Sequence, residues 1–144
     1  MNAVFTNPFI AALLHVLQTM ACTKLVLGKL SKKNDDYAGG DISGLIIMVG
    51  DNIQGSMSIS FEEGLVLEVM HKMLNEKPHS IDSEVQDLVG EFTNMICGVA
   101  KNELAQKGYD FGMAIPMVVS GKKPRNYPSS GWRKTNDAIF SSVR

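Results

Sequence analysis

The chain has 144 residues, of which 44% are hydrophobic and 20% are charged, and it carries a formal net charge of −1 at pH 7. A chain of this length and composition is expected to fold as one globular domain, residues 1–144, that needs neither disulfides nor a metal. Lys and Arg (14) nearly balance Asp and Glu (15), so no overall field favours nucleic acid or an anionic membrane as a partner. The basic run at residues 122–125 is typical of a solvated loop.

The cysteines and the apolar N-terminal stretch are expected to be structural. Cys22 and Cys97 lie in apolar helical patterns without CxxC spacing or a His cluster, which indicates small buried thiols and no metal site. The apolar stretch 9–20 is interrupted by His15 and Gln18, lacks a basic segment before it and is too short to span a bilayer. We therefore expect a cytoplasmic protein without an export signal or a membrane-spanning segment.

The first predicted element is a helix that follows Asn7 and Pro8. Asparagine is a favoured N-cap and proline is favoured at the first helical position, so this pair predicts the start of the helix. Apolar residues at helical spacing continue to near Cys22, where the helix is expected to end. Residues 24–29 are predicted to form a short strand, followed by a polar turn over residues 32–36.

The clearest β signal is a hairpin between residues 42 and 61. Residues 42–49 are a short apolar run rich in isoleucine, and the turn cluster Gly-Asp-Asn follows at residues 50–52. Residues 53–61 then alternate strictly between apolar residues or glycine and polar residues. This pattern predicts an antiparallel hairpin with one buried face and one wet face.

Two helices are predicted after the hairpin. The first covers residues 62–75 and carries apolar side chains at helical spacing. The second begins at an N-cap, either Ser80 or Asp82, and runs to about Lys107. Gly108 is expected to end it, because glycine is the favoured residue just after a helix.

The remaining chain completes the fold prediction. Residues 110–121 are predicted to form one strand that bears Pro116, which is expected at an edge, an end or a bulge because proline cannot donate to a strand ladder. Residues 122–144 hold few aliphatics, and only residues 138–143 resemble a strand. The order of elements predicts an α+β fold with helices packed on an antiparallel or mixed sheet.

The long predicted helix carries three polar residues, Asp87, Glu91 and Asn94, on one face, because their spacing is i, i+4 and i+7. Gly90 and Gly98 lie one turn before and one turn after Asn94, and each costs a helix about 0.5–1 kcal/mol relative to alanine. Two such glycines indicate a flat face that another molecule approaches closely. The alternative is the ordinary solvated side of an amphipathic helix, opposite an apolar side that holds Val85, Leu88, Val89, Phe92, Ile96 and Val99.

No pairing of a nucleophile with a base is visible in the sequence. His15, His71 and His79 are scattered over two predicted helices and a loop, and none lies beside a suitable Ser or Cys. A small-molecule hydrolase therefore has no support from the residues.

The ordered set of motifs resembles the CheC/CheX/FliY family of bacterial chemotaxis phosphatases, and its CheX type most closely. That family carries an Asp or Ser, then Glu four residues on, Asn three residues after it, and a Pro some twenty residues later, as Asp87, Glu91, Asn94 and Pro116 stand here. The helix sequence V-Q-D-L-V-G-E-F-T-N-M-I-C-G, the opening N-P-F-I and the hairpin are similar as well. The resemblance covers residues 5–121 and implies a CheC-like fold, with helices on a largely antiparallel sheet.

The resemblance also implies a reaction. The substrate would be the phosphorylated aspartate of a CheY-like response regulator, which supplies its own Mg²⁺, so this chain needs no cofactor or metal of its own. Asn94 would position the attacking water, and Glu91 would pair with the regulator's lysine. Gly90 and Gly98 would permit close approach, and Asp87 would support the helix face or contact the partner.

Three further expectations follow from the resemblance. One copy of the helix motif favours a single site per subunit, and the family suggests a homodimer. The alternative function is a non-catalytic binding module of the same fold that docks on a response regulator or a flagellar switch component. Residues 122–144 depart from the family pattern and are expected to be a divergent or shortened end of the domain.

Overall fold

The computed structural model describes residues 3–28, 31–32, 39–51, 53–121 and 139–140. Within them the secondary structure comprises helices α1 (Ala3–Ala21), α2 (Glu63–Leu74) and α3 (Ser83–Gln106) and strands β1 (Ser31–Lys32), β2 (Ile42–Val49), β3 (Gln54–Phe61), β4 (Gly112–Met113), β5 (Met117–Ser120) and β6 (Ile139–Phe140).

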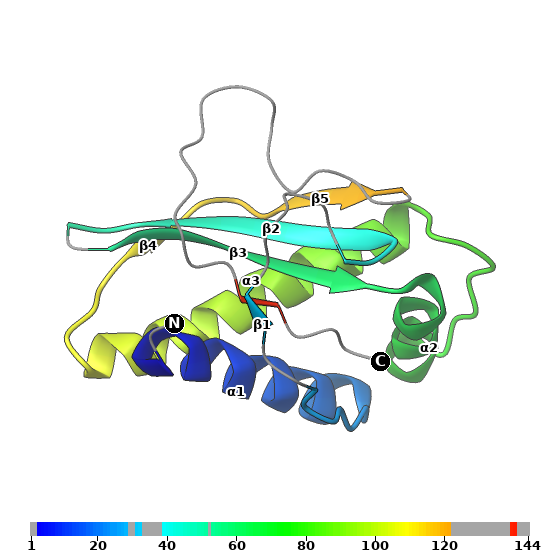
Figure 1. Ribbon diagram of the computed structural model, residues 1–144. Helices are drawn as coiled ribbons and strands as arrows, with labels where there is room; N and C mark the ends of the chain where they lie inside the picture. The colour runs from blue at the N-terminus through cyan, green and yellow to red at the C-terminus, as the bar shows by residue number, and fades with distance from the viewer. Residues whose placement is uncertain (1–2, 29–30, 33–38, 52, 122–138, 141–144) are drawn as a thin grey trace.

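The elements form layers, with a sheet on one side and helices beneath it. Figure 1 shows α3 lying between the sheet and α1, with α2 at one end of the sheet. In the four-stranded sheet, β2 is central: it pairs with β3 on one side and with both β4 and β5 on the other, antiparallel throughout. β1 and β6 form a separate antiparallel pair. The predicted α+β fold with a largely antiparallel sheet is confirmed.

The predicted hairpin is confirmed, and Ile59 and Phe61 of its predicted inner face are buried, whereas the serines of its predicted outer face are half-buried. β2 and β3 pair in one continuous register from Ile42–Phe61 to Val49–Gln54. Ser43, which lies opposite Ser60 in the register, is fully buried, and its hydroxyl lies 2.6 Å from that of Ser60. Because the two hydroxyls bond to each other, a polar pair is accommodated on a buried face at this end of the hairpin.

The first helix starts earlier than predicted. α1 begins at Ala3, so Pro8 lies inside the helix and is buried there rather than opening it. Tertiary packing supports the turn before the proline, because the Phe5 ring lies 4.6 Å from the Tyr109 ring, centroid to centroid. The start signal at Asn7 and Pro8 is therefore wrong, since packing overrides the local preference.

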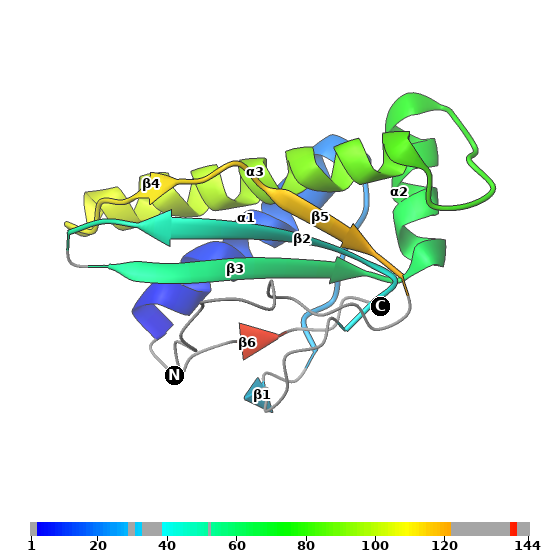
Figure 2. The same ribbon diagram turned by 90° about the horizontal axis from the view of Figure 1, so that it is seen from above.

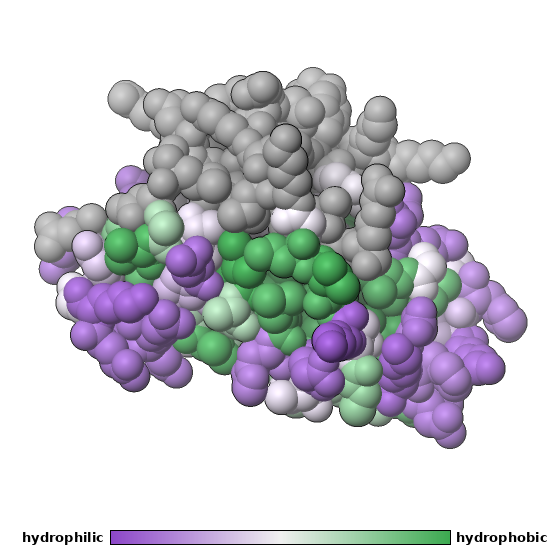
Figure 3. Space-filling model, turned by 60° about the horizontal axis from the view of Figure 1, so that its bottom comes forward, coloured by the Kyte–Doolittle hydropathy of each residue, from purple (hydrophilic) through white to green (hydrophobic). Residues whose placement is uncertain are grey.

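α1 is also longer than the apolar stretch 9–20 that was predicted to be too short to span a bilayer. It contains an 18-residue stretch with a mean hydropathy of 1.3, so by length and composition alone the helix could cross a membrane, a test that core helices and signal sequences pass too. Seven of its 19 residues are buried, and α1 packs mainly against α3, so only one face of the helix is covered. The outer face of the molecule on this side carries an apolar area in its middle (Figure 3).

Two expectations around Cys22 are corrected. α1 ends at Ala21, close to the predicted position, but Cys22 is exposed and has a positive φ of 47°. Residues 24–28 form no strand, and the nearest strand in the described part of the chain is β1, whose second residue, Lys32, begins the predicted polar turn 32–36; the rest of that turn lies outside the described residues. Only Cys97 is a buried thiol, and burial raises its pKa to about 11.

The helix α3 begins and ends as its flanking residues predict. The Asp82 side chain accepts a hydrogen bond from the backbone N–H of Val85 at 3.0 Å, and Gly108 follows the helix end with φ of 88°. The inner face of α3 lies directly against β2, because a Cβ added at Gly44 would overlap the Thr93 hydroxyl. This contact places α3 firmly under the sheet.

The apolar side of α3 was predicted with one error. Val99 is 41% exposed, whereas Thr93, Cys97, Ala100 and Leu104 join the buried face. The buried residues of α3 serve both the sheet and α1, so the apolar stripe is wider and shifted relative to the predicted one. Of the predicted C-terminal strand 138–143, residues 139–140 form β6 and the rest lies outside the described residues.

Candidate functional site: a groove between a helix and a broken strand

The predicted strand 110–121 is broken in two by a bulge. β2 pairs with β4 at Met48–Met113 but with β5 at Leu45–Met117, so three residues of the later segment lie opposite two residues of β2. Pro116 is one of these three and lies directly before β5, as expected of a residue that cannot donate to the ladder. The prediction of one continuous strand over residues 110–121 was therefore wrong, because the proline interrupts the pairing with β2.

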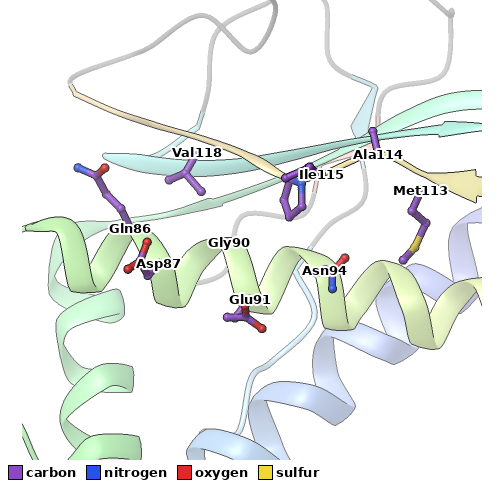
Figure 4. A pocket seen from close by; sticks show the side chains of 10 residues that line it. Gln86, Asp87, Gly90, Glu91, Asn94, Met113, Ala114, Ile115 and Val118 are labelled. Atoms are coloured by element: carbon purple, nitrogen blue, oxygen red, sulfur yellow. The ribbon is translucent and has the colours of Figure 1, made fainter.

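A groove open to solvent lies between α3 and this broken strand. α3 runs alongside β4 and β5 (Figure 2), and Met113 and Val118 point from the broken strand toward α3 (Figure 4). Its volume is about 780 Å³. The lining residues are Gln86, Asp87, Gly90, Glu91 and Asn94 from α3 and Met113, Ala114, Ile115, Pro116 and Val118 from the broken strand.

The three polar residues singled out in the sequence all lie on the helix side of this groove. Asp87, Glu91 and Asn94 are exposed. In the part of the chain that the structure describes, neither the Glu91 carboxylate nor the Asn94 amide has a hydrogen-bond or ion-pair partner, so both are available to another molecule. Pro116, distant in the sequence, lies across the groove from them.

Gly90 and Gly98, the two glycines predicted to permit close approach of a partner, differ in position. Gly90 lines the groove, and a Cβ there would lie 3.5 Å from the Val118 side chain, an ordinary packing distance. Gly98 lies one turn beyond Asn94 and outside the lining set, and a Cβ there would meet nothing within 4 Å. Gly90 is therefore the glycine that shapes the groove itself.

Several lining residues were not predicted. Gln86 lies one turn before Gly90, so the helical period that identified Asp87 could have found it. Met113, Ala114, Ile115 and Val118 could not be found in this way, because the bulge that sets their orientation arises from pairing with β2.

The charge at the groove is acidic. Among the lining residues that the structure describes, Asp87 and Glu91 are the only charged ones. Nearby, the carboxylate of Glu76 raises the pKa of Glu84, which indicates a local excess of negative charge beside the start of α3. A partner that fits this end of the helix should present a positive group.

The chemistry available in the groove is positioning rather than covalent attack. None of the described lining residues is a Ser, Cys, Lys or His, so the described groove offers no hydroxyl, thiol, amine or imidazole nucleophile. Among the described residues, no cluster of three or more His, Cys, Asp or Glu could hold a metal ion. The groove offers a carboxylate and an amide on an exposed helix, which suit the recognition and orientation of another molecule.

Comparison with known proteins identifies the family to which this combination of fold and groove belongs. The family model "Chemotaxis phosphatase CheX" matches residues 42–131, a segment that contains the whole groove. The chain therefore belongs to the CheX family, and the resemblance seen in the sequence is confirmed. No curated protein matches the chain.

Solved structures support the same assignment. A CheC-like superfamily protein from Shewanella sp. PV-4 is 54% identical with a TM-score of 0.87, over 100% of this chain and 91% of that one. The chemotaxis protein CheX from Vibrio vulnificus is 55% identical with a TM-score of 0.79, over 83% of this chain and 80% of that one. CheX from Borrelia burgdorferi, solved as a CheX–CheY–BeF3–Mg²⁺ complex, is 25% identical with a TM-score of 0.69, over 82% of this chain and 77% of that one.

Proposed function

We propose that this protein hydrolyses the aspartyl phosphate of a CheY-like response regulator and thereby ends a chemotaxis signal. The observation that carries the proposal is the placement of Glu91 and Asn94, exposed and without partners among the described residues, on the helix wall of an open groove. Membership of the CheX family and the CheY-bound state of the Borrelia relative support this choice of substrate.

In the proposed reaction, α3 approaches the acyl phosphate of the regulator and Asn94 orients a water molecule. The water oxygen attacks phosphorus in line with the bond to the aspartate oxygen. That bond breaks, so the products are the free carboxylate, inorganic phosphate and one proton released to solvent. The amide of Asn94 has one acceptor and two donor hydrogens, so it can hold the water and fix its direction. A loose transition state needs little help from a base, so positioning is sufficient.

Glu91 has the docking role in this proposal. It lies one turn before Asn94, so its carboxylate would pair with the regulator's lysine while the amide reaches the phosphate. Gly90 and Gly98 are proposed to leave room for the partner's loops, and Asp87 to contact the partner or add to the acidic face. The Mg²⁺ of the reaction would belong to the regulator, since acyl-phosphate chemistry needs the ion at the phosphate rather than on α3.

A radiolabelled regulator provides the test. We expect this protein to accelerate the loss of label from the phosphorylated regulator at catalytic, substoichiometric concentration. The rival function is a binding module, which would bind the phosphorylated regulator without changing the rate. Binding without acceleration would therefore contradict the phosphatase and support the module.

Two further parts of the proposal concern the whole protein. We propose that the protein works in the cytoplasm, where its regulator is phosphorylated, and that it forms a homodimer. Sedimentation velocity at micromolar concentration measures the second point directly. A single species of twice the 15.7 kDa chain mass is expected, and a monomer throughout would contradict it.

A further inference from the structure

The groove has one polar wall and one apolar wall. All lining residues on α3 are polar or glycine, and all lining residues on the broken strand are apolar, Met113, Ala114, Ile115, Pro116 and Val118. Figure 4 shows Met113 and Val118 pointing from the broken strand toward α3, which carries Asp87, Glu91 and Asn94. The proposed reaction uses the polar wall alone and leaves the apolar one without a role.

Ile115 is the outstanding residue of the apolar wall. Its side chain is 92% exposed, the highest value among the exposed large hydrophobic residues of the described chain. It lies in the bulge, between Ala114, whose N–H donates to the Ile47 carbonyl at 2.9 Å, and Pro116. A bulge turns a side chain away from the regular alternation of a strand, and the following proline restricts the Ile115 backbone to an extended conformation. The local structure therefore holds this isoleucine out of the sheet.

We propose that Ile115 is a specificity-determining contact for the response regulator, and that it packs against an apolar side chain on the regulator surface beside the phosphorylation site. This inference rests on the proposed function. A surface that fits the groove must present a positive group to Glu91 and an apolar group to Ile115. Since these groups meet opposite walls, the regulator can dock in one orientation only, with its acyl phosphate toward Asn94. Ile115 is a positioning residue here and takes no part in bond making.

Truncation of the side chain tests the proposal. The regulator that this protein dephosphorylates is loaded with BeF3⁻ and Mg²⁺, and its Kd is measured against the unaltered protein and Ile115→Ala. We expect Kd and KM to rise about tenfold, because an anchor residue that loses its buried contact typically costs this much, while kcat stays within about twofold. Ile115→Asp is expected to weaken binding further, and Ile115→Val to restore most of it.

Matched controls separate docking from folding. Val26→Ala removes a β-branched side chain that is 80% exposed and outside the groove, and it should leave Kd unchanged. Thermal unfolding of Ile115→Ala should match that of the unaltered protein, because an exposed side chain has little packing to lose. An apolar contact also persists at about 0.5 M salt, where an exposed ion pair is largely screened.

The outcomes distinguish this inference from the function on which it rests. If Ile115→Ala and Ile115→Asp both bind and turn over the regulator as the unaltered protein does, the inference is wrong and the phosphatase stands. A fall in kcat at unchanged Kd would also overturn it. If the unaltered protein neither binds a regulator nor accelerates the loss of its phosphate, the proposed function fails and the inference falls with it.

Discussion

The two walls of the groove differ in chemistry and in the way they are built. The helix wall stands on one regular element, so its spacing in sequence is its spacing in space, and Asp87, Glu91 and Asn94 share a face automatically. The strand wall depends on an irregularity, a bulge at Pro116 that exposes Ile115. The two walls therefore have different proposed roles. The helix wall supplies polar groups for chemistry and docking, and the bulge supplies an apolar contact.

The largest expected effect belongs to Asn94 on the helix wall. Asn94→Ala should lower kcat by about 100-fold or more, because the loss of a positioning group of this kind typically costs that much. The measurement is the rate of label loss from the phosphorylated regulator at saturating enzyme. Asn102→Ala is the matched control, since Asn102 is an exposed asparagine of the same helix outside the groove lining. Equal activity of Asn94→Ala and Asn102→Ala would remove the proposed role of the helix wall.

Glu91 should affect docking more than chemistry. Glu91→Lys places a positive charge where the regulator's lysine is expected, so Kd should rise by about 30-fold or more, and by less for Glu91→Ala. The effect should shrink with added salt, in contrast to that of Ile115→Ala. Glu103→Ala is the control, because Glu103 lies on α3 outside the groove lining and pairs with Lys107 at 2.9 Å. If Glu91→Lys binds the regulator with unchanged Kd, the proposed ion pair between Glu91 and the regulator's lysine does not form.

The packing contact between α3 and the sheet can be tested separately from the groove. A Cβ at Gly44 would overlap the Thr93 hydroxyl, so Gly44→Ala should destabilise the protein by about 1–3 kcal/mol. Thr93→Ala alone should cost less, and the double variant should recover part of the loss because the overlapping hydroxyl is gone. Chemical denaturation of all four proteins measures this coupling. Strict additivity would mean that α3 does not rest on β2 at this point.

The smallest effects separate the two glycines. Gly90→Ala should be folded and should weaken regulator binding several-fold, because a methyl group there narrows the groove toward Val118. Gly98→Ala should raise helix stability by up to about 1 kcal/mol and change binding less, since a Cβ there finds open space. Thermal unfolding and Kd are measured for both variants. A larger binding loss for Gly98→Ala would show that the partner reaches further along α3.

The sequence predicted those parts of the fold that follow from local signals. Asp82 starts α3 by capping it, and Gly108, with its positive φ, follows its end. Both effects involve residues within one turn of each other in the chain. The hairpin followed from strict alternation and a turn cluster. The helix wall of the groove was readable for the same reason, because a helical period converts spacing directly into a shared face.

The errors lie where distant contacts decide. Pro8 predicted a helix start, but packing of Phe5 on Tyr109 extends α1 before it. Ser43 lies in a strand that was predicted to be apolar, and the hydrogen bond between its hydroxyl and that of Ser60 allows it to be buried. Ile115 could not be recognised, because its exposure depends on a shift in register between β2 and the strand segments around Pro116. Only the family resemblance linked Pro116 to the helix motif.

The central claim is that the helix wall inserts at the phosphorylation site of the regulator. A crystal structure of this protein bound to its BeF3⁻- and Mg²⁺-loaded regulator tests it most directly. We expect the Asn94 amide within hydrogen-bond distance, about 3 Å, of a water or fluoride at the beryllium site, and the Glu91 carboxylate in contact with the regulator's lysine. A complex in which α3 faces away from the beryllium site, or in which Asn94 remains in bulk solvent, would contradict it.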